Sequence, residues 1–197
     1  MENTPTLTTP RLLLRRFTPD DAPAMWELLR DEEVNTFLPW FPVKTLEEAR
    51  QHLQERYLSQ YSRARSYHYA VCLRETGQLI GYANVSDTEA RDLGYGFRKE
   101  FWHQGFATEA ARAVVEQLRQ DGVPYITATH DVNNPHSGGV MRKLGMQYQY
   151  SYEEQWQPKN ILVTFRMYQL NLDGKDRVYR AYWEQYPHFV EEEFHEL

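Results

Sequence analysis

The chain has little cysteine, no long apolar run and no excess of positive charge. Cys72 is the one cysteine among 197 residues, which excludes an intrachain disulfide. Because it lies in the apolar run Tyr69–Leu73, we interpret it as a small buried hydrophobe rather than a nucleophile. No apolar stretch approaches the ~20 residues that a membrane helix needs, and no basic segment followed by an apolar one opens the chain. We therefore expect a cytoplasmic protein with no membrane partner.

The charge balance and the missing motifs exclude further classes. The net charge is −6, which disfavours nucleic acid as a partner and suits a cationic substrate such as an amine. Seven histidines are present, but they form no His-Glu-x-x-His motif and no zinc-type spacing, so no metal is expected. A Gly-x-Ser-x-Gly elbow is also missing, which argues against a serine hydrolase.

Hydrophobic patterning predicts an α/β protein with one main domain. Apolar alternation indicates strands, and apolar residues at i, i+3 and i+4 indicate helices. The predicted order is strand, two helices, antiparallel strands, helix, strand, helix and two strands. The predicted strands are Arg11–Phe17, Tyr67–Leu73, Gln78–Val85, Asp92–Arg98, Tyr125–His130, Gln147–Trp156 and Ile161–Leu170. Helices are predicted after Thr18, after Thr45, from about Ala107 and at Pro135–Leu144. We assign residues 1–170 to the domain and 171–197 to a C-terminal helical appendage.

A short turn before the third predicted helix has the features of an anion site. Gly105 and Ala107 leave room for a close approach to the backbone, and Thr108 offers a hydroxyl. The free N–H groups and the dipole of a helix N-terminus bind anions without a basic side chain. The turn is neither a Walker loop nor a dinucleotide fingerprint. Taken alone, it is more typical of a tight structural turn.

Several separated motifs resemble one family. Leu93–Arg98 followed by Phe101–Ala110 resembles the acetyl-CoA motif of the GNAT superfamily of N-acetyltransferases. More narrowly, the chain is similar to the branch containing the ribosomal-protein N-terminal acetyltransferases. The other matching segments are Thr9–Arg15, Pro19–Ala22, Leu38–Trp40, Asn134–Ser137 and Lys143–Met146, and together they cover roughly Leu7 to Leu170.

The resemblance implies a fold, a donor and a donor site. The fold would be a mixed, mostly antiparallel central sheet flanked by helices and splayed at a bulge in its fourth strand, Asp92–Arg98. The cosubstrate would be acetyl-CoA, whose pantetheine arm pairs with the backbone of Phe97, and the Phe97 N–H would polarise the thioester carbonyl. The pyrophosphate would lie on the amides of His103, Gln104, Gly105, Phe106, Ala107 and Thr108. Asn134 and Ser137 would lie near the thiol.

The candidate catalytic residues match the family pattern less closely than the donor site does. Many family members carry a tyrosine that protonates the leaving thiolate, and the matching residue is Met141, which leaves Ser137 or a water for that task. Asp92, two residues before Gly94, is the candidate general base, and a solvated loop acid is the alternative. His68 and His130 are the next candidates for the base, although a structural role suits both.

The sequence indicates less about the acceptor than about the donor. By resemblance, the loop Phe37–Val43 walls the acceptor pocket, so Trp40 and Phe41 are candidate substrate contacts or, alternatively, core anchors. Glu191, Glu192 and Glu193 are interpreted as a solvated end of the chain. The function predicted is acetyl transfer by direct attack of a primary amine, either a protein N-terminal α-amine or a small-molecule amine. A non-catalytic acyl-CoA-binding module is the alternative, and the protein would be a monomer or homodimer.

Overall fold

The structure is a computed structural model that describes residues 3–192. The elements in chain order are β1 (Leu7–Thr8), β2 (Leu12–Arg15), a 3₁₀ turn (Pro19–Asp21), α1 (Ala22–Leu29), α2 (Leu46–Arg56), a second 3₁₀ turn (Leu58–Ser62), β3 (Tyr67–Leu73), β4 (Leu79–Val85), β5 (Leu93–Phe97), a third 3₁₀ turn (Lys99–Phe101), α3 (Phe106–Gln120), β6 (Tyr125–Asp131), α4 (Pro135–Lys143), β7 (Gln147–Trp156), β8 (Ile161–Asn171), α5 (Ala181–Gln185) and β9 (His188–Phe189). The predicted order of elements and the α/β class are confirmed.

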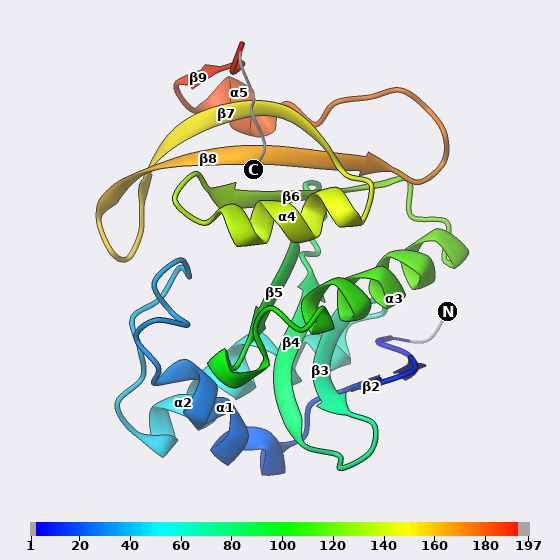
Figure 1. The fold of residues 1–197 in the computed structure, drawn as a ribbon, viewed down its shortest axis with the longest axis vertical. Helices are drawn as coiled ribbons and strands as arrows, with labels where there is room; N and C mark the ends of the chain where they lie inside the picture. The colour runs from blue at the N-terminus through cyan, green and yellow to red at the C-terminus, as the bar shows by residue number, and fades with distance from the viewer. Residues whose placement is uncertain (1–2, 193–197) are drawn as a thin grey trace.

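The strands form two antiparallel sheets that meet at one point (Figure 1). The first sheet has the order β1-β2-β3-β4-β5, and the second has the order β6-β8-β7-β9. They are linked by a parallel bridge between Asp92, just before β5, and Thr127 of β6. Beyond this bridge β5 and β6 belong to different sheets, so the expected splay is present.

The splay does not arise from a bulge in the pairing of β5. The register against β4 runs without a shift from Gly81 opposite Phe97 to Val85 opposite Leu93. The register shift in this sheet lies in β3, between Val71 and Cys72. The expectation of a bulge at the splayed strand is therefore wrong for this pairing. The β5 edge opens because β6 pairs with β8 beyond the bridge.

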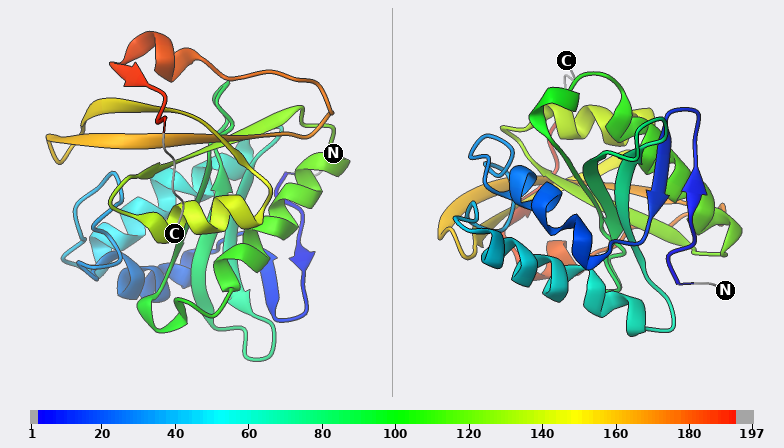
Figure 2. Two further views of the ribbon diagram at one scale, coloured as in Figure 1. Left: turned by 45° about the horizontal axis from the view of Figure 1, so that its top comes forward. Right: turned by 90° about the horizontal axis from the view of Figure 1, so that it is seen from below.

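Helices cover both faces of the first sheet, as the views from two sides show (Figure 2). α3 buries its apolar stripe, including Ala110, Val114 and Leu118, against one face of the sheet. α1 and α2 cover the other face, where Ala70 and the buried Cys72 of β3 lie. Cys72 is thus a buried small side chain, as expected. Within residues 3–192, no helix combines the length and the apolar character needed to cross a membrane.

Local signals explain where the helices begin and end. The Thr45 hydroxyl accepts the amide of Glu48 at 3.2 Å and caps α2. Before α1, the Asp21 carboxylate accepts the amide of Thr18 at 2.8 Å. Gly145 follows α4 with φ +83°, the left-handed conformation in which helices commonly end.

The segment after β8 folds back onto the second sheet (Figure 1). α5 packs on β7, and β9 pairs with β7 through Ser151 opposite Phe189. Glu191 accepts hydrogen bonds from Arg166 at 2.7 Å and from the Ser151 hydroxyl at 2.7 Å. The expectation of a solvated acid is therefore wrong for Glu191, since it anchors the segment, and Glu193 lies outside the described residues.

Candidate active site

A single cleft of about 1980 Å³ lies where the two sheets part. Its walls come from the Glu33–Trp40 loop, the end of α2, β4 and β5, the start of α3, the end of β6, α4, β7 and α5. The cleft thus joins segments from almost the whole chain.

The splayed edge of β5 presents backbone groups to the cleft. Ser86 donates to the Asp92 carbonyl at 2.9 Å, and Arg98 donates to the Ile80 carbonyl at 2.8 Å. In an antiparallel pair such bonded positions recur at every second residue. The N–H and C=O of Tyr95 and Phe97 therefore point away from β4. The Phe97 carbonyl accepts the Trp102 indole at 2.8 Å. The donors on this edge are therefore the N–H groups of Tyr95 and Phe97, and that of Phe97 lies nearer in sequence to the turn before α3.

The turn before α3 has the backbone geometry of an anion site. His103 and Gly105 have φ of +59° and +81°, and Gly105 is the N-cap of α3. The amides of Phe106, Ala107 and Thr108 occupy the first helical turn, where no intrahelical acceptor exists. Left-handed residues beside a helix N-terminus gather N–H groups around an anion. Of the expected loop residues, all except Gln104 line the cleft.

Arg11, from the turn between β1 and β2, holds this loop from behind. Its guanidinium donates to Glu109 of α3 at 2.6 Å and to the Gln104 carbonyl at 3.0 Å. The same guanidinium lies 4.2 Å from the centre of the Phe106 ring. The side chain of Gln104 turns away and donates to the Glu100 carbonyl. The loop is therefore fixed by contacts on the side opposite the cleft.

Two hydroxyls meet at the start of α4. The Tyr95 hydroxyl of β5 donates to the Ser137 carbonyl at 2.8 Å and lies 3.1 Å from the Ser137 hydroxyl. Asn134 is the N-cap of α4 and lines the cleft with Ser137. Met141 is buried and lines the cleft one turn later. At Met141, α4 therefore has no phenol, but the phenol of Tyr95 in β5 contacts Ser137.

Asp92 lies at the junction of the two sheets and lines the cleft. The Thr127 hydroxyl donates to its carboxylate at 2.9 Å, and the Ser86 hydroxyl accepts its amide. Burial raises the pKa of Asp92 to about 6, and the Thr127 bond opposes that rise. Within residues 3–192 no ion pair involves Asp92, so its charge is uncompensated.

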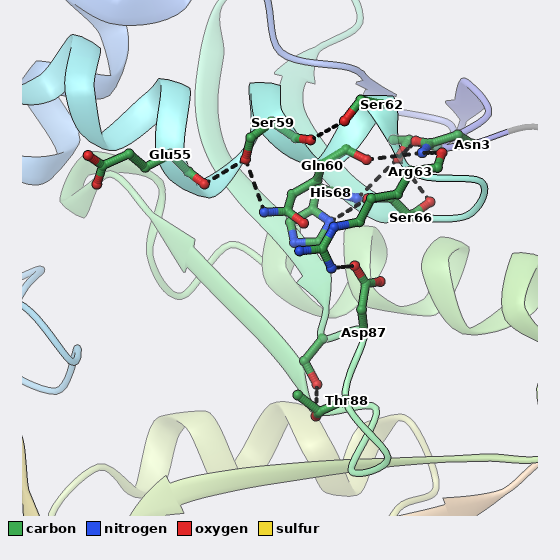
Figure 3. Close-up of polar contacts among 12 residues, drawn as sticks. Asn3, Glu55, Ser59, Gln60, Ser62, Arg63, Ser66, His68, Asp87 and Thr88 are labelled. Atoms are coloured by element: carbon green, nitrogen blue, oxygen red, sulfur yellow. Dashed lines mark hydrogen bonds and ion pairs between the residues drawn. The ribbon is translucent and has the colours of Figure 1, made fainter.

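The part of the cleft lined by Arg63, His68 and Asp87 contains a network of polar contacts (Figure 3). Arg63 forms an ion pair with Asp87 at 2.5 Å, and the Ser66 hydroxyl lies 2.6 Å from Nδ1 of His68. Burial lowers the pKa of His68 to about 4, so its ring is neutral at pH 7. His68 thus lines the cleft as a weak base. Asp87 differs from Asp92 in having a cationic partner.

His130 also lines the cleft, but α4 covers it. Its Nδ1 lies 2.8 Å from the Asp131 carbonyl, which favours the tautomer with the proton on Nδ1. A Cβ on Gly138 would lie 2.7 Å from Nε2, so the ring packs directly beneath the helix. Burial lowers the pKa of His130. These contacts suit a packing role.

The structure separates the two predicted acceptor contacts. Trp40 lines the cleft, donates to the Asn35 side chain at 2.7 Å and lies 4.6 Å below the Arg56 guanidinium. Phe41 is 61% exposed and does not line the cleft. Trp40 therefore lies where an acceptor in the cleft would meet it, whereas the Phe41 side chain points to solvent, and contact between Phe41 and an acceptor stays a prediction.

The C-terminal part of the chain completes the wall of the cleft. Glu154 of β7, Tyr182 of α5 and Tyr186 after it line the cleft. Tyr182 and Tyr186 both stack on Tyr152, with ring centres 5.0 and 5.3 Å away. Burial raises the pKa of Glu154, and the neighbouring Tyr186 hydroxyl opposes that rise. The sequence analysis missed these residues.

Comparisons with known proteins decide the family. The chain matches the model of the Acetyltransferase (GNAT) domain over residues 11–147. This chain belongs to the GNAT acetyltransferase family. An uncharacterized N-acetyltransferase of Bacillus subtilis (strain 168), YoaA, is 28% identical over 148 residues, which is 73% of this chain and 83% of that protein.

Solved structures agree on the GNAT fold. An acetyltransferase of this family from Bacillus anthracis has a TM-score of 0.75 at 22% identity, covering 86% of this chain and 99% of that one. RimL, a ribosomal L7/L12 alpha-N-protein acetyltransferase in complex with coenzyme A, has a TM-score of 0.76 at 19% identity, covering 87% of this chain and all of that one. The protein is thus an N-acetyltransferase, and GNAT enzymes use acetyl-CoA as donor.

The donor end of this GNAT cleft fits acetyl-CoA. The helix start and the left-handed loop suit a diphosphate, and the open edge of β5 suits the amide-bearing pantetheine arm. Within the described range, no three His, Cys, Asp or Glu side chains gather in a way that could hold a metal ion.

The contacts missed by sequence reasoning differ in how well they could have been found. Tyr95 alternates with Gly94 and Gly96, so its exposure on a strand face could have been inferred. Arg11, Glu154 and Tyr186 act across long sequence separations, and no local pattern marks them.

Proposed function

We propose that this acetyltransferase transfers the acetyl group of acetyl-CoA to a primary amine by direct attack on the thioester. The acceptor is a protein N-terminal α-amine or a small-molecule amine. The observation that carries the proposal is Asp92, a carboxylate without a cationic partner at the point where the β5 edge opens. It lies in the same cleft as the anion-binding start of α3.

Asp92 suits the general base. An amine attacks only as the free base, and its pKa is about 8 for an α-amine and about 10.4 for a lysine. With a pKa of about 6, Asp92 is ionised at pH 7 and still basic enough to accept a proton, directly or through water. His68, with a pKa of about 4, is the weaker base in the cleft.

The reaction then follows from the geometry of β5. The amine nitrogen bonds to the thioester carbon, and the carbonyl electron pair moves to oxygen. The N–H of Phe97, which points away from β4, stabilises the developing oxyanion. Asp92 takes the proton from nitrogen, and the carbon–sulfur bond breaks as the carbonyl re-forms.

The leaving thiolate needs a proton, and Ser137 is the donor in this proposal. The Tyr95 hydroxyl gives its one proton to the Ser137 carbonyl at 2.8 Å and can turn it to the Ser137 hydroxyl, 3.1 Å away. Tyr95 is thus a positioning residue: its hydroxyl supports the Ser137 oxygen while the serine proton passes to sulfur, and Ser137 then recovers a proton from water. Burial raises the pKa of Tyr95, which keeps the phenol protonated.

Product release tests this function directly. The full chain is incubated with acetyl-CoA and a panel of peptides and small amines, and free thiol is measured. We expect thiol release that depends on the amine, with an acetylated product of matching mass. Coenzyme A binding without turnover on any amine would contradict the proposal and leave a non-catalytic acyl-CoA-binding module.

A further inference from the structure

The acidic residues that line the cleft fall into two groups. Two of them form ion pairs, Glu33 with Lys99 and Asp87 with Arg63. The other four, Glu55, Asp92, Asp131 and Glu154, take part in no ion pair between described residues. Glu55 and Asp131 accept from the neighbouring side-chain amides of Gln51 and Asn133, and Asp92 accepts from the Thr127 hydroxyl.

Asp92 and Glu154 line the same cleft as a stacked aromatic pair. The rings of Tyr152 and Tyr182 line that cleft too, with their centres 5.0 Å apart. Tyr152 and Glu154 are two residues apart in β7, so their side chains share one face of the strand. α5 adds Tyr182 and Tyr186 to that face.

This arrangement suits a cation more than a neutral group. Partly buried carboxylates without cationic partners and exposed aromatic faces both favour positive charge. The amine that reacts beside Asp92 must lose its proton before it attacks. Because that amine is neutral when it attacks, it cannot compensate the charge of Glu154. Lys159, the cation in the turn between β7 and β8, donates to the Asn35 and Thr36 carbonyls.

We propose that the acceptor carries a second positive charge beside its reacting amine, and that Glu154 and Tyr186 bind this charge against the ring of Tyr182. The inference rests on the proposed function and narrows its substrate class. Two sources share this chemistry: a small diamine or polyamine, and a peptide whose N-terminal residue is followed by a basic side chain. The C-terminal segment is then a specificity element of the enzyme.

Matched acceptors test the inference. One arm compares linear diamines with linear monoamines of the same length. The other compares peptides with lysine or glutamine after the N-terminal residue. We expect kcat/KM to be about tenfold higher or more for the dicationic member of at least one arm, and the arm that responds identifies the source.

Two variants tie the preference to the residue. Glu154→Gln keeps the shape and removes the charge, so it should lower kcat/KM for the dicationic acceptor to that of its monocationic match and abolish the preference. Glu153→Gln is the matched control, because Glu153 points to the opposite face of β7 and does not line the cleft. That variant should keep the preference.

The failures of the two proposals are distinguishable. Equal kcat/KM within every matched pair, with amine turnover present, overturns the inference and leaves the proposed function intact. An equal loss of rate on all amines in Glu154→Gln also overturns it, because Glu154 would then act on the reacting amine. No turnover on any amine contradicts the proposed function itself.

Discussion

The two ends of the cleft face their ligands with different kinds of chemical group. At the donor end, the groups that face the ligand are backbone amides: the edge of β5 and the first turn of α3. At the acceptor end they are side chains from distant segments, with Asp92 before β5, Trp40 in a loop, Glu154 in β7 and Tyr186 after α5. The donor end therefore depends on backbone conformation, and the acceptor end depends on which residue occupies each position.

This difference predicts how each end responds to change. Backbone amides persist when a side chain is replaced, so donor binding should weaken only when the backbone loses its support. A side chain that faces the acceptor is lost outright on replacement. Acceptor-end variants should therefore give the larger and more selective effects, and the predictions below are ordered accordingly.

Asp92→Asn should have the largest effect. Loss of a general base typically lowers rates by about 10²–10⁴-fold, and we expect kcat to fall within that range. Affinity for coenzyme A should stay within about twofold, since Asp92 lies at the acceptor side of the junction. Steady-state kinetics and calorimetry measure the two quantities. A parallel loss of coenzyme A affinity would break the distinction between the two ends.

Stability provides the control for that variant. The pKa of Asp92 rises from 3.8 to about 6 on folding, so ionising it costs folding free energy as pH passes upward through this window. Asp92→Asn should therefore raise the free energy of unfolding at pH 8 by roughly 1–3 kcal/mol, and Tm should rise with it. Near pH 3.5 the variant should show no gain in either quantity. A variant that loses activity and stability together at pH 8 would indicate misfolding instead.

Tyr95→Phe should have the next largest effect. Removing the hydroxyl that supports Ser137 should lower kcat by about tenfold with KM for acetyl-CoA unchanged. A thioester with a more acidic leaving thiol should recover most of the rate, because its thiolate needs less help from an acid. Tyr125→Phe is the control, since that hydroxyl bonds the Glu89 carbonyl outside the cleft. Equal losses with both thioesters would remove Tyr95 from this role.

Arg11→Ala tests the support of the donor end. Without the guanidinium on Gln104 and Glu109 the loop before α3 loosens, so KM for acetyl-CoA should rise about fivefold to tenfold with kcat retained. Arg119→Ala, at the other end of α3 in an exposed pair with Glu116, should change neither parameter. An unchanged KM in Arg11→Ala would show that the loop holds itself.

The smallest effect is expected at Phe41. Phe41→Ala should leave acceptor KM within about twofold, because that side chain is mostly exposed and outside the cleft. Trp40→Ala should raise acceptor KM several fold, since it removes the ring beneath Arg56 and the bond to Asn35. Acceptor titrations at saturating acetyl-CoA measure both. The reverse order would contradict the assignment of Trp40 to the cleft.

Much of the fold could be predicted from the sequence because its signals are local. The apolar stripe of α3, the cap at Thr45 and the glycine after α4 each act within a few residues. β3 and β7 have the bounds that the sequence predicted. The bulge was misplaced because register depends on pairing between strands, and glycines in β5 instead leave room for Tyr82 over Gly96.

The same difference between local and long-range signals applies to the candidate site. The turn at Gly105 lies in the motif that begins at Leu93, and Asp92 directly precedes that motif, so neighbouring residues predicted both. Glu154 and Tyr186 reach the cleft, and Arg11 reaches the loop behind it, only through tertiary packing. The sequence did not distinguish Trp40 from Phe41, since neighbouring loop residues can face opposite ways and composition does not reveal which one turns inward.

The pH dependence of kcat/KM for a single amine tests the central claim most directly. Below about pH 6 both the ionised fraction of Asp92 and the free-amine fraction rise with pH, and above it only the latter does. For the wild-type enzyme the slope of log kcat/KM against pH should therefore halve near pH 6. For Asp92→Asn it should stay at the lower value throughout. The same break in both proteins would contradict the account of Asp92 as the base.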